Sequence, residues 1–332
     1  MKFTALKRTA AVATVAAFAL AGAPAHAQDV TLKIGWTTSD GEQDPYAITA
    51  RQFAEALETL SPGTFEVQYF PNNQLGDEKE MVEGLKFGTL DVGVITNAVI
   101  ANVEPAFQIN DLPFLYGSHE QAHRILDGSI GNRLMAKLRD NGIVGLGFSE
   151  GGFRHMINNS KPVNTPADVE GVKYRTMQNP VFINMFESLG GNANPMAWSE
   201  VYTAVQQGTV DGLEIPVAVI HNNKFAEVTE YLSLTRHTYS ALGILMSEKT
   251  YNELTLDQRI TVWRAAEIAE TEERMMNRAN VETLIGKLED EGMQVNQVEN
   301  PGAFRDKVKP VYDRFKDEIG ADLMEDILSR VQ

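Results

Sequence analysis

Residues 119–123 read H-E-Q-A-H and match the H-E-x-x-H pattern of zinc-dependent hydrolases. In that pattern two histidines on one face of a helix bind zinc, and the glutamate between them activates a water molecule. Ser118 is a typical helix N-cap, however, and it would place His119 in the first helical turn, where rigid ligation is difficult. We therefore favour a solvated helix start, and we keep a secreted zinc-dependent hydrolase using His119, Glu120 and His123 as the alternative.

A second motif matches the nucleophile elbow of serine hydrolases. Residues 147–151 read G-F-S-E-G, and Asp211 and His237 follow Ser149 in the order that a catalytic triad of this class requires. An elbow needs a helix directly after the serine, but here two glycines lead into the alternating, extended segment 153–157. The sequence therefore disfavours a hydrolase built on Ser149.

Two arginines are candidates for binding an organic acid. A guanidinium group binds a carboxylate through two parallel hydrogen bonds. Most arginines in so acidic a chain would pair with surface carboxylates, but Arg175 is expected at the carboxyl end of a short strand, where open α/β sheets place ligands. Glycines precede Arg154 and allow the backbone to approach a ligand closely. These two side chains therefore favour recognition of a carboxylate.

Composition limits the kinds of partner. The chain has 332 residues, with 29 lysines and arginines, 45 aspartates and glutamates, and no cysteine. The length predicts two domains, and 43% hydrophobic with 22% charged residues is typical of a globular protein. The absence of cysteine excludes disulfides, a thiol nucleophile and an iron–sulfur cluster. A formal net charge of −16 argues against nucleic acid and anionic membranes, since both repel a polyanion.

The first 27 residues have the pattern of a secretory signal. Three basic residues precede the apolar segment 9–23, and residues 25–27 read A-H-A, which is a typical cleavage site. A membrane anchor is disfavoured because the apolar run is short and ends at Pro24. Cleavage after Ala27 would leave 305 residues with a formal net charge of −19. The mature protein is therefore expected to be soluble and periplasmic.

Strands and helices alternate in the first third of the mature chain. Apolar and polar residues alternate over 30–36, which predicts a strand with one buried face. Asp44 and Pro45 are suited to opening a helix that ends near residues 61–63. The elements expected next are a strand at 65–70, a helix from about Asp77 to Gly88 and a strand at 91–96. This alternation predicts a parallel α/β sheet.

One pattern occurs twice. An amphipathic helix ends at a glycine that begins the sequence G-T-L-D at residues 88–91, and a strand follows. The same arrangement recurs with G-T-V-D at residues 208–211. Helix–glycine–strand junctions are common, so chance is an alternative. We favour two similarly built α/β lobes, because a repeated pattern about one domain apart is typical of a repeated unit.

Thr255 and Gln258 form a capping box that opens a long helical region, which ends near Gly292. The residues expected on its buried face are Val262, Ala265, Ile268, Met275 and Leu284. At about 1.5 Å per residue, one helix of this length exceeds about 50 Å and could bridge two lobes. Two shorter helices broken near residues 277–280 are the alternative.

Several ordered blocks give the sequence a family resemblance. It resembles the solute-binding proteins of TRAP (tripartite ATP-independent periplasmic) transporters, of the dicarboxylate-binding type, from about Leu32 to Tyr312. The blocks that carry the resemblance are F-P-N-N-Q-L-G-D at 70–77, D-L-P-F-L at 111–115, G-F-R-H at 152–155, D-V-E-G-V-K-Y-R at 168–175, P-M-A-W-S-E-V-Y at 195–202 and G-T-V-D-G at 208–212.

The resemblance implies an α/β fold of the periplasmic binding protein kind, with two lobes, a cleft between them that closes on the ligand, and a long helix spanning both. We expect lobe 1 to comprise 28–151 and about 241–280, and lobe 2 to comprise 152–240 and about 281–332. The protein would be a monomer without enzymatic activity or cofactor. It would capture a small organic acid and deliver it to the small and large membrane subunits of the permease.

The resemblance also implies a set of ligand-binding residues. Arg175 would pair with the substrate carboxylate, Arg154 would help to hold it, and Trp198 would form a wall. The full predicted set is Arg175, Arg154, Trp198, Glu214, Gln178, Thr37, Thr96, Asn97, Glu78 and Ile215.

Two positions depart from the family pattern. Ile215 stands where many members have an asparagine, and Thr96 stands where sialic-acid binders have an acidic residue. Sialic acid is therefore disfavoured, and a smaller or less hydroxylated acid is expected, with sugar acids left open. A sensor-linked binding protein with the same cleft is a further alternative.

Overall fold

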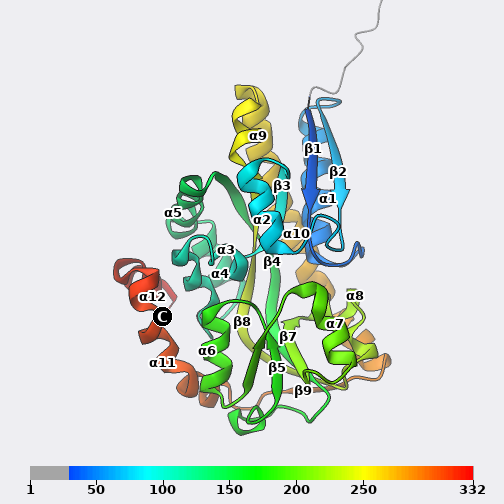
Figure 1. Ribbon diagram of the computed structural model, residues 1–332, viewed down its shortest axis with the longest axis vertical. Coiled ribbons are helices and arrows are strands. Elements are labelled where there is room, and N and C mark those ends of the chain that lie inside the picture. Colours follow the sequence, from blue (N-terminus) through cyan, green and yellow to red (C-terminus); the bar gives the residue numbers. More distant parts are fainter. Residues whose placement is uncertain (1–29, 332) are drawn as a thin grey trace, which may run out of the picture.

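The computed structural model describes residues 30–331, so the predicted signal segment and its cleavage site lie outside the described residues. Within the described range, nine strands form one sheet in the order β2-β1-β3-β8-β4-β7-β5-β6, with β9 beside β8 (Figure 1). The strands are β1 (Val30–Gly35), β2 (Phe65–Phe70), β3 (Val92–Thr96), β4 (Ile143–Asn158), β5 (Lys173–Thr176), β6 (Asn192–Pro195), β7 (Gly212–Pro216), β8 (Tyr231–Ser247) and β9 (Gln294–Gln297).

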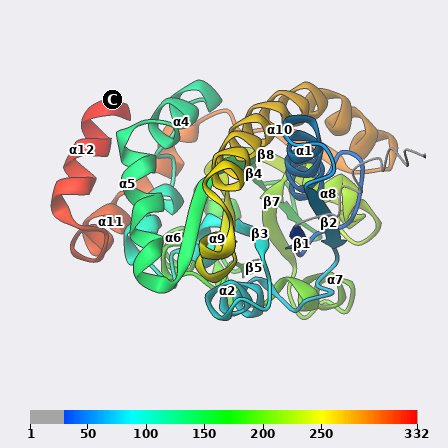
Figure 2. The same ribbon diagram turned by 90° about the horizontal axis from the view of Figure 1, so that it is seen from above.

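Helices cover both faces of this sheet (Figures 1 and 2). The α-helices are α1 (Pro45–Leu60), α2 (Glu78–Phe87), α3 (Asn97–Ile100), α4 (His119–Leu126), α5 (Ser129–Lys137), α6 (Pro180–Ser188), α7 (Trp198–Gln206), α8 (Val217–Asn222), α9 (Glu248–Glu253), α10 (Leu256–Asp290), α11 (Pro301–Ile319) and α12 (Ala321–Val331). Short 3₁₀ helices are η1 (Pro105–Asp111), η2 (Leu138–Asn141), η3 (Pro166–Asp168) and η4 (Phe225–Glu227). No helix in the described range is long and apolar enough to cross a membrane.

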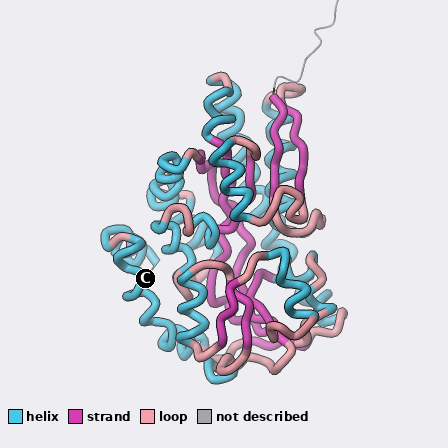
Figure 3. Tube along the Cα trace, viewed as in Figure 1, coloured by secondary structure: helices cyan, strands magenta, loops and turns pink. Residues whose placement is uncertain are grey.

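Two long strands connect two parallel sets. β1 pairs in parallel with β2 and β3, and β5 pairs in parallel with β6 and β7. β4 and β8, of 16 and 17 residues, run antiparallel to each other and pass from the first set to the second (Figure 3). The predicted two-lobed α/β fold is confirmed. The sheet is mixed rather than purely parallel, because each parallel set joins a crossing strand in antiparallel register.

The repeated sequence pattern forms the same structure in each lobe. α2 ends at Gly88, whose backbone is left-handed with φ 74°, and β3 follows; α7, Gly208 and β7 repeat this order. Asp91 accepts a hydrogen bond from the backbone N–H of Lys33 at 2.9 Å, and Asp211 accepts one from Lys173 at 2.9 Å. In both lobes the aspartate therefore connects the start of one strand to its parallel neighbour, β3 to β1 in the first set and β7 to β5 in the second.

The capping box at Thr255 opens one continuous helix, α10, of 35 residues. At about 1.5 Å per residue it is about 52 Å long, so the single-helix alternative is correct. It packs against α1, α8 and β4. Its predicted buried face is wrong at Ile268 and Met275, which are 38% and 60% exposed. The inward positions at this point are occupied instead by Glu273 and Asn277, whose side chains contact the backbone of β4.

The C-terminal helices run back along the molecule. α11 contacts α6 and η1, and α12 contacts α4. Gln121 of α4 donates a hydrogen bond to the carbonyl of Val331 at 2.8 Å. The predicted boundaries of the two lobes remain a prediction. Residues 281–332 were expected in lobe 2, and their last helix, α12, packs against α4 of the predicted lobe 1.

Two apolar cores lie on opposite faces of the sheet, because neighbouring residues of a strand point to opposite sides. On β8, Leu245 belongs to the core under α2 to α6, α11 and α12, whereas Ile244 and Met246 belong to the core under α1, α7, α8 and α10. Each core extends through both lobes. Since the chain has no cysteine, packing in these cores replaces disulfides as the source of stability.

Leu245→Ala should destabilise the protein, because Leu245 is wholly buried on a central strand. We expect the free energy of unfolding in urea to fall by about 2–5 kcal/mol. Leu256→Ala is the matched control, since Leu256 is 73% exposed, and it should change this free energy by less than about 0.5 kcal/mol. Equal effects of the two substitutions would contradict the described core.

Candidate functional site

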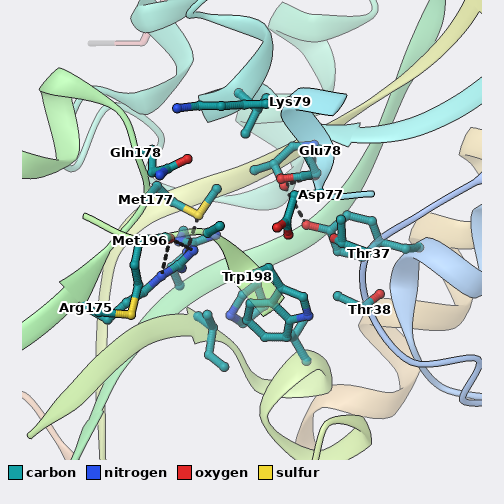
Figure 4. Close-up of a pocket in the computed structure, with 18 residues that line it drawn as sticks. Thr37, Thr38, Asp77, Glu78, Lys79, Arg175, Met177, Gln178, Met196 and Trp198 are labelled. Atoms are coloured by element: carbon teal, nitrogen blue, oxygen red, sulfur yellow. Dashed lines mark hydrogen bonds between the residues drawn. The ribbon is translucent and has the colours of Figure 1, made fainter. Parts of the chain in front are cut away.

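A pocket lies between the two parallel sets, with an empty volume of about 540 Å³. Figure 4 shows its lining residues. Lobe 1 contributes residues that follow β1, begin α2 and end β3; lobe 2 contributes residues that follow β5, begin α7 and end β7. The lining residues are Thr37, Thr38, Tyr46, Asp77, Glu78, Lys79, Thr96, Val99, Arg154, Arg175, Met177, Gln178, Met196, Ala197, Trp198, Ile215, Pro216 and Val219.

Arg175 lies at the end of β5 and is only 2% exposed. Its Nε and Nη2 donate to the carbonyl oxygen of Met196 at 3.1 and 2.8 Å, and Nη1 contacts the sulfur of Met177 at 3.4 Å (Figure 4). Burial lowers the pKa of Arg175 to about 10, so the group is still charged at neutral pH. No carboxylate in the described range lies within ion-pair distance of this guanidinium. It is therefore a buried positive charge that lacks an anion.

Arg154 is held differently. Its Nη2 donates to Oε1 of Glu214 at 2.8 Å and to the Glu214 backbone carbonyl at 2.7 Å, and its Nε completes a two-pronged ion pair. Burial opposes the charge on Arg154, but the carboxylate outweighs it and raises the pKa of this arginine. His237 contacts the same carboxylate at 3.2 Å, and burial lowers the pKa of His237, which keeps it neutral. Most of the anion-binding capacity of Arg154 is thus already used by Glu214.

On the lobe 1 side of the pocket, hydrogen bonds connect Tyr46, Thr96 and Glu78 in series. Glu78, the first residue of α2, accepts from the backbone N–H and the hydroxyl of Thr96 at 2.6 and 2.7 Å. The hydroxyl of Tyr46 lies 2.7 Å from that of Thr96 and donates to it, because Thr96 already donates to Glu78. Burial raises the pKa of Glu78. This wall therefore offers acceptor oxygens rather than positive charge.

The lobe 2 side is more apolar. Trp198 packs against Phe225 and lies beside Arg175, whose guanidinium carbon is 5.9 Å from its ring centroid. Met177, Met196 and Ile215 also line the pocket. A flat molecule with one apolar face can therefore rest on this wall while its polar groups face lobe 1.

Hydrogen bonds across the pocket connect the two lobes. Ser199 at the start of α7 donates from its hydroxyl to Asp77 at 2.7 Å, next to the pocket mouth. The side chain of Asn102 donates to the carbonyl of Gln178 at 3.1 Å, and that of Asn179 donates to the carbonyl of Ala98 at 3.0 Å. These contacts describe a closed arrangement, in which Arg175 is withdrawn from water.

The structure brings together eight of the ten predicted residues: Arg175, Arg154, Trp198, Gln178, Thr37, Thr96, Glu78 and Ile215 line the pocket. Glu214 lies behind the lining and contacts Arg154. Asn97 does not line the pocket, because its amide donates to the carbonyl of Phe107 and to Asp111 inside lobe 1 at 2.9 Å each, so a role for Asn97 toward a ligand remains a prediction. The roles of the eight residues toward a ligand remain predictions. The sequence did not predict the other ten lining residues, which are Thr38, Tyr46, Asp77, Lys79, Val99, Met177, Met196, Ala197, Pro216 and Val219. Six of them, Thr38, Asp77, Lys79, Met177, Ala197 and Pro216, adjoin a predicted residue in the sequence, and this adjacency was the available signal.

The hydrolase motifs do not assemble catalytic sites. Ser149 is buried within the continuous strand β4 and accepts a hydrogen bond from Thr49 at 2.9 Å, so there is no elbow. Glu120 points outward to Arg278 at 2.6 Å. Ser118 caps α4 as predicted, but the expectation of solvated histidines is wrong, because the side chains of His119 and His123 turn inward and are 17% exposed.

Known proteins that are similar to this chain include solute-binding proteins. Residues 37–318 match the family model described as bacterial extracellular solute-binding protein, family 7 (DctP). A solute-binding protein of Verminephrobacter eiseniae is 37% identical over 308 residues, which cover 91% of this chain and 90% of the relative.

Two solved structures are similar throughout. A TRAP periplasmic solute-binding protein of Polaromonas sp. JS666, bound to D-erythronate, has a TM-score of 0.87 at 35% identity, covering 90% of this chain and 98% of that one. The sugar acid binding protein of Advenella mimigardefordensis, in complex with galactonate, has a TM-score of 0.88 at 32% identity, covering 92% and 98%. These relatives are transport proteins and give no support to the zinc-hydrolase alternative. The chain belongs to family 7 of the bacterial extracellular solute-binding proteins, the solute-binding subunits of TRAP transporters that bind organic acids.

Proposed function

We propose that this protein captures a small hydroxylated monocarboxylate in the interlobe pocket and delivers it to a TRAP permease in the membrane. The observation that carries the proposal is the buried guanidinium of Arg175, which has no carboxylate partner in the described range. A ligand carboxylate would neutralise this charge where water is excluded, and hydrogen bonds to charged groups contribute about 1.5–3 kcal/mol each.

Charge favours one carboxylate rather than two. Of the two arginines that line the pocket, Arg154 is neutralised by Glu214, so Arg175 alone offers an uncompensated buried charge. Lys79 is exposed at the rim. A second ligand carboxylate would instead face Asp77 and Glu78, which repel it. We therefore expect a monocarboxylate rather than a dicarboxylate as the ligand.

Acceptor oxygens favour hydroxyl groups on the ligand. Asp77 and Glu78 line the wall opposite Arg175, and the hydroxyls of Thr37 and Thr38 lie beside them (Figure 4). Ligand hydroxyls can donate to these carboxylates and exchange hydrogen bonds with the threonines. The D-erythronate and galactonate held by the two structural relatives are hydroxylated monocarboxylates, which supports the same class.

We propose that delivery of the ligand to the permease depends on closure of the two lobes around it. Bringing the lobes together removes water from Arg175 and strengthens its attraction for the carboxylate. We propose that the monomeric, closed, ligand-bound form is the one that the small and large permease subunits recognise. The mature protein would reach them in the periplasm after cleavage behind Ala27.

A thermal-shift screen tests the ligand class. D-erythronate, galactonate, D-glucuronate and pantoate should raise the Tm of the mature protein, and succinate should raise it less, because its second carboxylate meets Asp77 and Glu78. Isothermal titration calorimetry would then give the affinity of the best compound. A larger shift with succinate than with every hydroxylated acid would contradict the monocarboxylate assignment, and no shift with any compound would contradict the proposal.

Arg175→Ala should weaken binding of that best compound by about 100-fold or more, because it removes the charge that neutralises the carboxylate. Arg175→Lys should lose about tenfold, since an ammonium keeps the charge but not the planar fork. Arg314→Ala, on the exposed side of α11, is the matched control and should bind like the wild type. Wild-type affinity of Arg175→Ala, measured by calorimetry on protein with a native circular dichroism spectrum, would contradict the assignment.

Ser199→Ala should speed ligand release by about two- to tenfold and leave association unchanged, because it removes an interlobe hydrogen bond to Asp77 that forms only when the lobes are closed. Stopped-flow displacement would measure the rate. Ser329→Ala on α12, where the hydroxyl bonds within its own helix, serves as control. An unchanged release rate in Ser199→Ala would show that this contact does not hold the lobes together.

A further inference from the structure

A cluster of nitrogen and oxygen ligands lies outside the pocket, between α4 and β4. Nδ1 of His119 and Nε2 of His123 lie 3.0 and 2.7 Å from the same oxygen, Oε2 of Glu150. The two histidines are four residues apart on α4, which places them on one face of the helix. Glu150 comes from β4, just before the register shift between Glu150 and Gly152.

The spacing of the cluster is close to that of a metal site. The three potential ligand atoms lie within 4.8 Å of one another. Zinc binds histidine nitrogens and carboxylate oxygens at about 2.0–2.2 Å, which puts tetrahedral ligands about 3.3 Å apart. The two nitrogen–oxygen distances are shorter than this by a few tenths of an ångström, so small rotations of the imidazole rings would open the position for an ion.

The charges around the cluster favour a cation. The Glu150 side chain is wholly buried, and its other oxygen, Oε1, has no hydrogen-bond partner within the described part of the chain. Glu273 of α10 is also fully buried, accepts from the backbone N–H of Glu150 at 2.9 Å, and likewise leaves Oε1 without a partner. The neighbouring Arg274 is already bound by Asp127 and the carbonyl of Phe148. Two buried carboxyl groups thus adjoin each other, and each has one oxygen without a hydrogen-bond partner in the described part of the chain.

We propose that His119, His123 and Glu150 bind one divalent transition-metal ion, with zinc as the best match to two imidazoles and a carboxylate. The 17% exposure of both histidine side chains provides an entry path and allows a water molecule to take the fourth position. Tyr239 donates to the same Glu150 oxygen and orients it.

The role of this ion is structural rather than catalytic. Glu120, which would activate water in a hydrolase, points away from the cluster and binds Arg278. The ion would instead fasten α4 to β4. Its position at Glu150 lies just before the part of β4 that pairs with β7, which begins at Arg154. It would therefore fix the crossing segment four residues before Arg154.

Cobalt is a suitable probe, because Co²⁺ bound by nitrogen and oxygen ligands in a four-coordinate site absorbs visible light. Untagged mature protein, stripped of metal with a chelator and desalted, would be titrated with CoCl₂. We expect an absorption band that saturates at one Co²⁺ per chain and is abolished by ZnCl₂. Because second-shell changes alone cost 10–100-fold in metal affinity, loss of a ligand in His119→Gln or His123→Gln should weaken Co²⁺ binding at least tenfold.

Two variants are matched controls. Glu120→Gln alters the motif without touching the cluster, and His221→Gln removes a histidine of α8 that pairs with Glu291. Both should bind Co²⁺ like the wild type. ZnCl₂ should raise the Tm of the wild type and of both controls, but not that of the double variant His119→Gln/His123→Gln, whose fold is checked by circular dichroism. Absence of the cobalt band in the wild type, or equal affinity in the double variant, would overturn the proposal.

Discussion

The structure depends on holding one guanidinium group away from water without a carboxylate to neutralise it. Leaving a charge in this state is unfavourable, and the fold reduces the cost with backbone and aromatic groups. The carbonyl of Met196 accepts two hydrogen bonds from Arg175, and Trp198 lies beside it. Met196 directly follows β6 and Trp198 is the first residue of α7, so the parallel pairing of β5 with β6 brings both to the arginine. We propose that an anionic ligand relieves what remains of this cost, and that this relief favours a carboxylate in the pocket.

The same constraint explains how so acidic a chain can bind an anion. Salt screens the field of surface carboxylates beyond about 8–10 Å, so the overall negative charge has little effect inside the pocket. What matters there is the local balance. The ion pair of Arg154 with Glu214 is internally neutral, and no carboxylate of the described residues lies within ion-pair distance of Arg175. Arg175 then dominates the electrostatics of the site. The two arginines look equivalent in the sequence, but their partners give them different roles.

Local signals in the sequence predicted much of the fold. Asp44, Thr255 and Gly88 mark helix ends through their own capping chemistry, and the repeated G-T-x-D pattern marked the two lobes. The predicted pocket residues were mostly those at strand ends, since topology alone brings such ends together. The sequence did not predict three tertiary contacts: the hydrogen bonds of the Asn97 amide inside lobe 1, the pairing of Arg154 with Glu214, and the polar buried face of α10 at Glu273 and Asn277. Apolar periodicity could not reveal these, because each depends on hydrogen bonds between residues distant in sequence.

The two crossing strands have a consequence for the stability of the whole molecule. β4 and β8 are bonded to each other along most of their length, and each apolar core runs through both lobes. Neither lobe therefore has a complete core or a closed set of strand pairs of its own, as an autonomous folding unit would. Heat or denaturant should melt both lobes in one cooperative transition, even though the proposed opening of the pocket would move the same lobes apart as units. Two lobes that are proposed to move separately during binding are thus not expected to fold or unfold separately.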